Sequence, residues 1–339
     1  MSMTHTTRDV SQRSDVRAGA PAIEATGLTR NFNANRAVDG LELSVAAGEI
    51  YGFLGPNGAG KSTAVRMLCT LLKPSGGTAT VAGHDVEREP LDVRRKIGVA
   101  LQDVALDEGQ TGRELLILQG RLYGLSLAAA RRRLDEVLDL VDIGDAIDRR
   151  IKTYSGGMKR RLDLAAALVH FPEVLFLDEP TTGLDPHSRT TVWSEVRRLN
   201  AELSMTIFLT TQYLEEADAL ADRVGILRTG QLVAEGPPTQ LKRALGDDVV
   251  VAEVEGHDAA TIERLAELDE VDNVTWDQGR LTISTPDASA ALAPIAQLLG
   301  DVGVSVRSIT LTTPTLDDVF MALTDSDVAG ARARVEVLA

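Results

Sequence analysis

The sequence is poor in cysteine, in basic residues and in long apolar runs, and each shortage excludes a class of protein. Among its 339 residues there is one cysteine, Cys69, so no disulfide can form within the chain and nothing indicates an oxidising compartment. Lysine and arginine total 35 against 50 aspartates and glutamates, a net charge of −15, which disfavours a general nucleic-acid binder. No run of about 18 apolar residues occurs, so we expect no membrane-spanning segment.

Apolar residues are nevertheless abundant enough to build a substantial core. Hydrophobic residues make up 44% of the chain, which is long enough for one large domain and a smaller one. Residues 1–21 are polar with scattered arginines, which predicts a disordered tail rather than a secretory signal. Cys69 lies in an apolar helical stretch, so we expect a buried and inert thiol.

Apolar strands alternate with helical patterns through the first two thirds of the chain. This alternation predicts an α/β fold with a doubly wound, largely parallel sheet. In the helical stretch from 103 to 152, Leu134, Val137, Leu138 and Val141 recur with helical spacing, and a core-facing stripe is favoured over a membrane surface. The expected strands cover 22–32, 41–45, 49–54, 174–177, 206–210 and 224–227, and the expected helices include 61–72 and 155–170.

From about Gly246 the pattern changes to strand, helix, two strands, helix and strand. That order predicts a small α+β domain of the ferredoxin-like type, followed by a helix over 314–323. The expected organisation is a tail over 1–21, a main domain over 22–245 with a helical subdomain at about 103–165, a second domain over 246–325, and a flexible tail over 326–339.

A glycine-rich loop between an apolar strand and a helix is the strongest motif of the sequence. Its glycines let backbone N–H groups turn inward around phosphate oxygens, and the following helix adds its positive end. A lysine next to it places charge on the β- and γ-phosphates, and a serine hydroxyl can reach Mg²⁺. The loop therefore predicts a P-loop that binds ATP, formed by Gly55, Pro56, Asn57, Gly58, Ala59, Gly60, Lys61, Ser62 and Thr63.

A second motif is the apolar strand that ends in Asp178 and Glu179. A carboxylate at such a strand end can hold Mg²⁺, which is the role predicted for Asp178. The adjacent Glu179 could polarise the attacking water. Alone, the pair could be an ordinary surface turn, but together with a P-loop it favours nucleotide hydrolysis.

A third motif is Ser155, Gly156 and Gly157 at the start of a helix. A serine hydroxyl and bare backbone amides at a helix start form an anion site, although by themselves they are equally a capped helix.

Together the three motifs resemble the ATP-binding cassette (ABC) ATPases, a family with the P-loop NTPase fold, over residues 22–245. The resemblance implies that Phe32 stacks on adenine and that Gln102 touches Mg²⁺ and couples the site to a membrane subunit. It also implies a head-to-tail homodimer, in which Ser155, Gly156 and Gly157 act on the other copy's ATP and Asp185 contacts the other copy's P-loop.

Two positions depart from the family pattern. Met158 stands where the signature usually has glutamine, and Gln212 stands where the family has its switch histidine. An amide can donate a hydrogen bond to the γ-phosphate but cannot titrate near neutral pH. We expect Gln212 to assist catalysis by Glu179 without adding a pH dependence, and an inactive Gln212→Glu beside a fully active Gln212→Ala would contradict this role.

The stretches 154–165, 210–218 and 314–320 resemble ATP-binding subunits of the daunorubicin/doxorubicin-resistance type. The resemblance implies a drug-exporting ATPase, peripheral on the cytoplasmic face of the membrane and bound to a separate integral membrane permease, with ATP and Mg²⁺ as ligands. Two alternatives remain at this point: a soluble cassette ATPase that acts on nucleic acid or ribosomes, which the acidic balance disfavours, and an importer ATPase. The transported substrate does not follow from this chain, because the permease would bind it.

Overall fold

The computed structural model describes residues 20–33, 35–101, 106–246, 248–255, 259–277 and 279–324. The chain divides into two compact units, Met1–Val233 and Ala234–Ala339. This division precedes helix α8 (Pro238–Leu245), whereas the sequence placed the domain boundary after it. The predicted domain limits therefore stay a proposal.

A six-stranded sheet forms the centre of the first unit, in the order β10-β9-β3-β8-β7-β6. The five strands from β9 to β6 pair in parallel. Four of them were expected from their apolar sequences, whereas β6 was not among the expected strands. The parallel arrangement brings the carboxyl ends of β3, β8 and β7 to one edge. The strands are β3 (Ile50–Leu54), β6 (Ile97–Ala100), β7 (Val174–Asp178), β8 (Thr206–Thr211), β9 (Arg223–Arg228) and β10 (Gln231–Gly236).

Helices connect the strands of this sheet. Helix α1 (Lys61–Leu68) follows the glycine-rich loop but ends before the predicted Leu72, because Cys69 caps it and Thr70 takes a left-handed backbone with φ 61°. Cys69 is buried and free, as expected. Further connections use α2 (Pro90–Lys96), α6 (Pro186–Leu203) and α7 (Leu214–Leu220), and the one from β6 to β7 runs through the helices described below.

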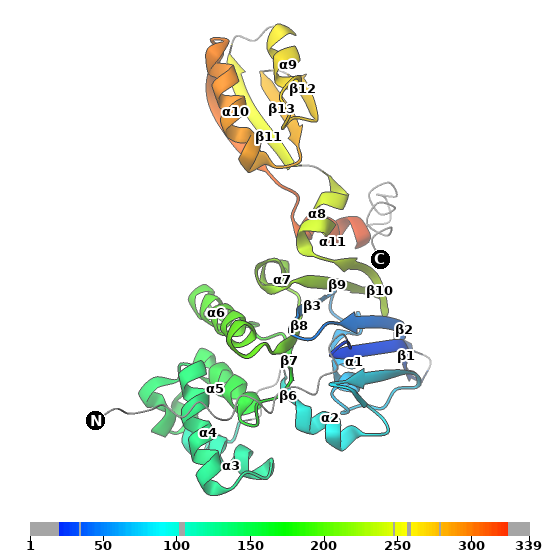
Figure 1. The fold of residues 1–339 in the computed structure, drawn as a ribbon, viewed down its shortest axis with the longest axis vertical. Coiled ribbons are helices and arrows are strands. Elements are labelled where there is room, and N and C mark those ends of the chain that lie inside the picture. Colours follow the sequence, from blue (N-terminus) through cyan, green and yellow to red (C-terminus); the bar gives the residue numbers. More distant parts are fainter. Residues whose placement is uncertain are drawn as a thin grey trace, which may run out of the picture. The chain divides into compact units, whose positions relative to one another are not determined.

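A smaller antiparallel sheet lies beside the parallel one, with the order β2-β1-β4-β5 (Figure 1). Buried and exposed residues alternate along β2, which is typical of a sheet with one face in the core. Phe32 is the last residue of β1, so the sheet presents it at a strand end. The strands are β1 (Ile23–Phe32), β2 (Asn35–Val45), β4 (Gly76–Val81) and β5 (His84–Asp85).

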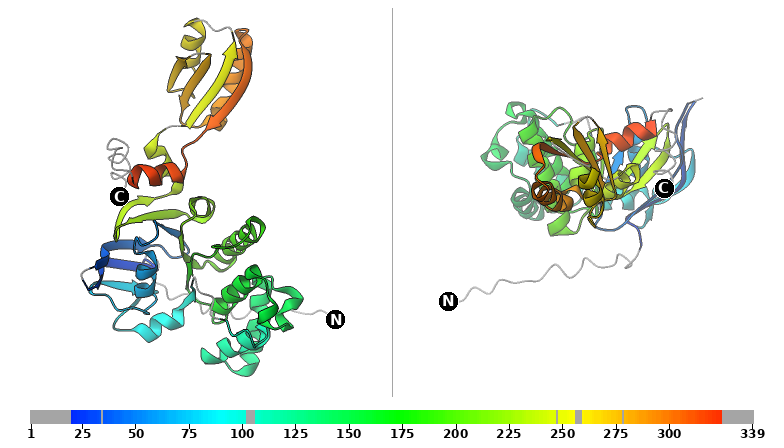
Figure 2. Two further views of the ribbon diagram at one scale, coloured as in Figure 1. Left: turned by 180° about the vertical axis from the view of Figure 1, so that it is seen from behind. Right: turned by 90° about the horizontal axis from the view of Figure 1, so that it is seen from above.

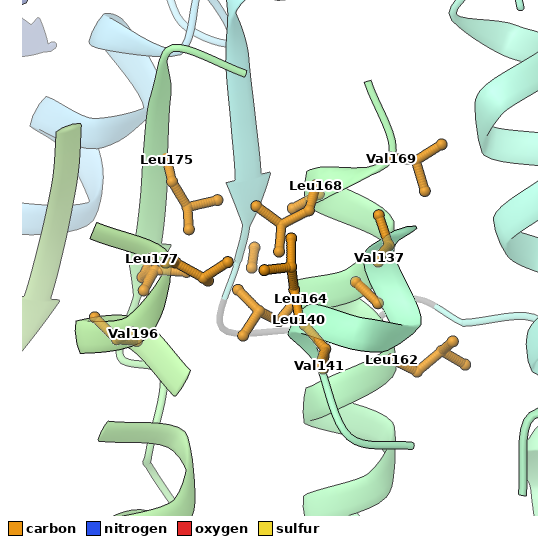
Figure 3. Packing of buried hydrophobic residues seen from close by; sticks show 14 of the residues in the cluster. Val137, Leu140, Val141, Leu162, Leu164, Leu168, Val169, Leu175, Leu177 and Val196 are labelled. Atoms are coloured by element: carbon orange, nitrogen blue, oxygen red, sulfur yellow. The ribbon is translucent and has the colours of Figure 1, made fainter. Parts of the chain in front are cut away.

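Helices α3, α4 and α5 gather away from the antiparallel strands (Figure 1). They start at sequence-encoded caps: Thr111 forms a capping box with Glu114, and Ser126 and Ser155 cap the next two helices. Apolar residues of α4 and α5 pack with Leu177 of β7 and Val196 of α6 in one buried cluster (Figure 3). The helices and turns are α3 (Gly112–Leu122), α4 (Leu127–Leu140), η1 (Gly144–Asp148), η2 (Ile151–Thr153) and α5 (Gly156–Leu168).

The second unit contains the predicted ferredoxin-like domain. Its sheet has the order β12-β13-β11-β14 with every neighbouring pair antiparallel, and α9 and α10 pack together on it (Figure 2). It has its own core, and α8 packs against α11 in the same unit. None of the described helices is both long and apolar enough to cross a membrane. The elements are β11 (Asp248–Glu255), α9 (Ala259–Ala266), β12 (Asn273–Asp277), β13 (Arg280–Thr285), α10 (Ala288–Asp301), β14 (Ser305–Thr312) and α11 (Leu316–Thr324).

Candidate nucleotide site

The loop between β3 and α1 is built so that only glycine fits at its two ends. A Cβ atom on Gly55 would lie 2.5 Å from the Leu227 carbonyl oxygen, and one on Gly60 would lie 2.2 Å from the Ala37 carbonyl oxygen. Gly60 also has a φ of 109°, which L side chains rarely adopt. Neighbouring backbone atoms therefore require glycine at both ends of the loop, whereas a Cβ on Gly58 would meet no atom within 4 Å.

Lys61 lies folded over this loop. Its ammonium donates hydrogen bonds to the carbonyl oxygens of Gly55 at 2.7 Å and Pro56 at 3.2 Å. Burial lowers the pKa of Lys61, and the negative charges of Glu179 and Asp178 partly offset this effect. The cation of the P-loop and the two acids at the end of β7 thus share one electrostatic environment.

Asp178 ends β7 and is 3% exposed. Its Oδ1 accepts hydrogen bonds from Ser62 Oγ at 3.4 Å and from Thr210 Oγ1. Thr210 is the residue opposite Asp178 in the β7–β8 register, so strand pairing alone sets this contact. Sequence reasoning missed Thr210, because only the order of the strands makes it a neighbour of Asp178.

Ser62 and Asp178 present a hydroxyl and a carboxylate to each other. Hard oxygen donors of this kind are the ligands that Mg²⁺ prefers. The pair therefore fits the magnesium site predicted from the sequence. The third predicted ligand, Gln102, lies outside the described residues.

Glu179 follows Asp178 with a left-handed backbone, φ 50°. Its N–H donates to the Thr210 carbonyl oxygen at 3.0 Å, which holds the turn against β8. Its Oε2 accepts from Thr182 Oγ1 at 3.2 Å. The turn places the two acids differently: Asp178 is buried and bonded, whereas Glu179 is half-buried at the edge of the site.

The serine–glycine motif opens α5. Ser155 caps the helix by accepting a hydrogen bond from the Met158 N–H at 3.3 Å, and both Ser155 and Gly156 are exposed. A Cβ on Gly157 would lie 3.2 Å from Ser188 Oγ, so the starts of α5 and α6 are close. Within the described part of the chain, no hydrogen bond joins this motif to the P-loop. The helix start is therefore open to a ligand or partner.

Asp185 caps α6. Its carboxylate accepts from Ser188 N–H at 3.0 Å and from Ser188 Oγ at 2.6 Å, and these bonds lower its pKa. Gln212 is exposed immediately after β8. Phe32 is 43% exposed, and the guanidinium of Arg30 lies 4.7 Å from its ring centroid. All three side chains thus lie at loop or strand ends.

Arg160 is a further residue that the sequence analysis did not assign to the site. It is 7% exposed and donates to the carbonyl oxygens of Pro180 at 2.9 Å, Leu101 at 2.8 Å and Asp178 at 3.3 Å. It thereby ties α5 to the ends of β6 and β7. The sequence offered one signal for this role: Arg160 lies four residues before Leu164, on the same face of α5. An arginine on a face that packs into the core needs hydrogen-bond partners there.

Comparison with known proteins agrees with this architecture. Residues 38–182 match the ABC transporter family model, and residues 236–324 match the C-terminal domain of DrrA1-3-like ATP-binding proteins. The chain is 51% identical over 308 residues to the daunorubicin/doxorubicin resistance ATP-binding protein of Streptomyces peucetius, covering 89% of this chain and 92% of that one.

It is 36% identical over 308 residues to the linearmycin resistance ATP-binding protein of Bacillus subtilis (89% and 98% covered). Among solved structures, cbiO1 from Clostridium perfringens, described as part of the ABC transporter complex cbiONQ, matches with a TM-score of 0.61 and 27% identity, covering 66% of this chain and 90% of that one. The P-loop NTPase fold and an ATP-hydrolysing activity are thereby confirmed. The chain belongs to the ABC family, among ATP-binding subunits of the daunorubicin/doxorubicin-resistance type.

Proposed function

We propose that this chain hydrolyses Mg²⁺-bound ATP as one half of a homodimer and thereby powers export through a separate integral membrane permease. The observation that carries the proposal is the convergence of Lys61, Ser62, Asp178 and Glu179 at the carboxyl edge of the parallel sheet. A cation, two metal-binding oxygens and a second carboxylate at one edge are the parts that phosphoryl transfer to water requires.

Each side chain has a distinct part in the proposed reaction. Lys61 leaves the carbonyls of its own loop and donates to the β- and γ-phosphate oxygens. Ser62 and Asp178 hold Mg²⁺, with Gln102 as the third ligand, and the ion when bound supplies charge neutralisation on those oxygens. Glu179 accepts a hydrogen bond from the attacking water, and Gln212 donates to the γ-phosphate. Phe32 stacks on adenine, an interaction of about 1–3 kcal/mol for a base on an aromatic ring.

The proposed dimer follows from the open start of α5. The chain has one P-loop and one serine–glycine helix start, and the latter is exposed in the single chain. A two-fold dimer lets Ser155, Gly156 and Gly157 of each copy donate to the γ-phosphate held by the other. Asp185, which its serine partner keeps ionised, then contacts the opposite P-loop. ATP closes the dimer because both halves contact the same phosphate, and hydrolysis opens it.

The export function rests on the relatives, which are described as drug-resistance proteins. These names favour export of drugs or other lipophilic compounds over import or an action on nucleic acid. The chain then works peripherally, on the cytoplasmic face of the membrane, through its permease.

The test of the proposed function is Glu179→Gln in the full-length chain. We expect kcat for ATP hydrolysis to fall by about 10²–10⁴-fold, while the Kd for ATP stays within about two-fold. Glu215→Gln, at an exposed position on α7, is the matched control and should keep the wild-type rate. A Glu179→Gln variant with the wild-type kcat would refute the proposed role. The same variant, purified with ATP, should bring its permease with it, and a monomeric, unaccompanied protein would count against the transporter assignment.

A further inference from the structure

Two loops of the proposed site continue directly into neighbouring helices. The first, Thr181–Asp185, precedes α6 and is called here the Asp185 loop. The second, Gln212–Tyr213, precedes α7 and is called the Gln212 loop. In the proposed dimer the first loop contacts the opposite ATP site and the second contacts the γ-phosphate of its own. Any link between α6 and α7 therefore links the two sites.

Two side-chain pairs join α6 to the start of α7, and Arg197 of α6 donates to a backbone carbonyl oxygen near the end of α7. Trp193 Nε1 on α6 donates to Glu216 Oε1 on α7 at 3.0 Å. One helical turn earlier on α6, the guanidinium of Arg189 lies 4.5 Å from the ring centroid of Tyr213. Since the partners are spaced by about one turn on both sides, these two contacts connect the first half of α6 to the start of α7.

Glu216 is the centre of this connection, because it is buried with 0% exposure. Burial raises its pKa, while the hydroxyls of Thr211 and Thr181 and the indole of Trp193 lower it. Thr211 ends β8 directly before Gln212, and its Oγ1 also accepts the Tyr213 N–H at 2.9 Å. One carboxyl group therefore faces polar groups from the Asp185 loop, from α6 and from the end of β8 next to the Gln212 loop.

The Asp185 loop reaches this network through Thr181, which is fully buried. Its hydroxyl is among the hydrogen-bonding groups that lower the pKa of Glu216. A buried carboxylate is costly unless polar groups bond to it, so the position of Thr181 next to α7 matters for both elements.

We infer that Glu216 is a positioning residue that couples the Gln212 loop to the Asp185 loop through Trp193, Thr211 and Thr181. This inference rests on the proposed function, since it assumes that the two loops contact ATP in a dimer. Glu216 does not touch the phosphates. A contact of Gln212 with the γ-phosphate shifts the start of α7, and the Trp193–Glu216 bond transmits the shift to Asp185. Each ATP site thereby reports its occupancy to the other copy.

The test compares Glu216→Leu, Glu216→Gln and Trp193→Phe in the full-length chain. Three quantities are measured: the Kd for ATP, kcat for hydrolysis, and ATP-driven dimerisation by sedimentation in a Glu179→Gln background. Glu216→Leu removes every polar contact, so we expect kcat and the dimer association constant to fall by about ten-fold or more with the Kd for ATP within about two-fold. Glu216→Gln keeps an acceptor for Trp193 and should retain both quantities within about three-fold.

Trp193→Phe removes one hydrogen bond and keeps an aromatic ring, so it should lower kcat by about three- to ten-fold. The second tryptophan of the chain provides the matched control: Trp276→Phe, on β12, should leave kcat and dimerisation unchanged. If Glu216→Leu does not fold, Trp193→Phe and Glu216→Gln still decide the question.

Wild-type kcat and dimerisation in Trp193→Phe or in folded Glu216→Leu would overturn the inference. A Kd for ATP that rises in proportion to the loss of kcat would also overturn it, since the residue would then only support the fold. Failure of the proposed function has a different signature, because the wild-type chain itself would neither hydrolyse ATP nor dimerise with it.

Discussion

At the residue scale, two acids that adjoin in the sequence have different surroundings. Asp178 continues the strand and is bonded to Thr210, whereas Glu179 leaves it through a left-handed turn and accepts from Thr182. A non-glycine residue in such a conformation costs about 1–3 kcal/mol unless its neighbours impose it. Here the Glu179 N–H bond to β8 imposes it. The turn therefore separates the two carboxylates: Glu179 lies half-buried at the edge of the site, while Asp178 stays with the hydroxyl of Ser62.

A pH prediction concerns Glu195, a buried acid of α6 that is 6% exposed. Burial raises its pKa to about 7, although the charges of Arg161 and Arg198 lower it. Between about pH 4.5 and pH 7, Glu195 is therefore protonated in the folded chain but ionised in the unfolded chain, where its pKa is 4.5. This contribution to stability is complete below pH 4.5 and is lost as the pH rises through about 7.

Glu195→Gln removes this titration. Between pH 5 and pH 8, the unfolding free energy of the variant should therefore rise by about 1–3 kcal/mol relative to the wild type. Chemical denaturation of both proteins at the two pH values measures the difference. Glu202→Gln, exposed on the same helix, should track the wild type at both values. If the unfolding free energies of Glu195→Gln and the wild type changed equally between the two pH values, the raised pKa of Glu195 would be refuted.

At the element scale, strand β6 depends on a close approach to α5. A Cβ on Gly98 would lie 2.4 Å from the Ala167 carbonyl oxygen and 2.9 Å from Pro172 Cγ. The backbone of α5 cannot move aside for an added methyl group as the end of a flexible side chain could. The strand leads to Leu101, whose carbonyl accepts from Arg160, so this packing also sets one edge of the site.

We therefore expect Gly98→Ala to destabilise the first unit by about 1–3 kcal/mol through overpacking. Thermal unfolding by circular dichroism measures the change. Gly300→Ala, on α10, is the control, since a Cβ there meets no atom within 4 Å and alanine favours a helix. The Gly300→Ala variant should keep or raise the melting temperature. A melting temperature of Gly98→Ala equal to that of the wild type would show that β6 can shift away from α5.

At the scale of the whole molecule, each chain contributes one half to each of the two proposed ATP sites. The net charge of −15 opposes self-association in the absence of a ligand, which is consistent with a dimer that closes on Mg²⁺-bound ATP as proposed above. The ferredoxin-like domain has a separate core and contributes none of the predicted site residues. The proposed composite site therefore involves only the two cassettes.

Mixing two inactive variants tests this directly. Lys61→Ala removes the phosphate contact of the P-loop, and Ser155→Arg blocks the helix start that serves the other copy. In an equal mixture half of the dimers have one intact composite site, so about a quarter of the wild-type ATPase rate should return. Lys61→Ala mixed with a chain that carries both substitutions should stay inactive. An inactive first mixture, or an active Ser155→Arg alone, would contradict action between copies.

The sequence by itself determined the fold class, the P-loop, the acids at the end of β7 and the capped start of α5, because contiguous residues encode each of them. It also determined the strand and helix order of the second unit, which the ferredoxin-like sheet confirms. Tertiary structure alone decided which distant residues meet: Thr210 reaches Asp178, and Trp193 reaches Glu216. The physical reason is that such contacts depend on strand order and on helix packing, neither of which any local pattern of residues specifies.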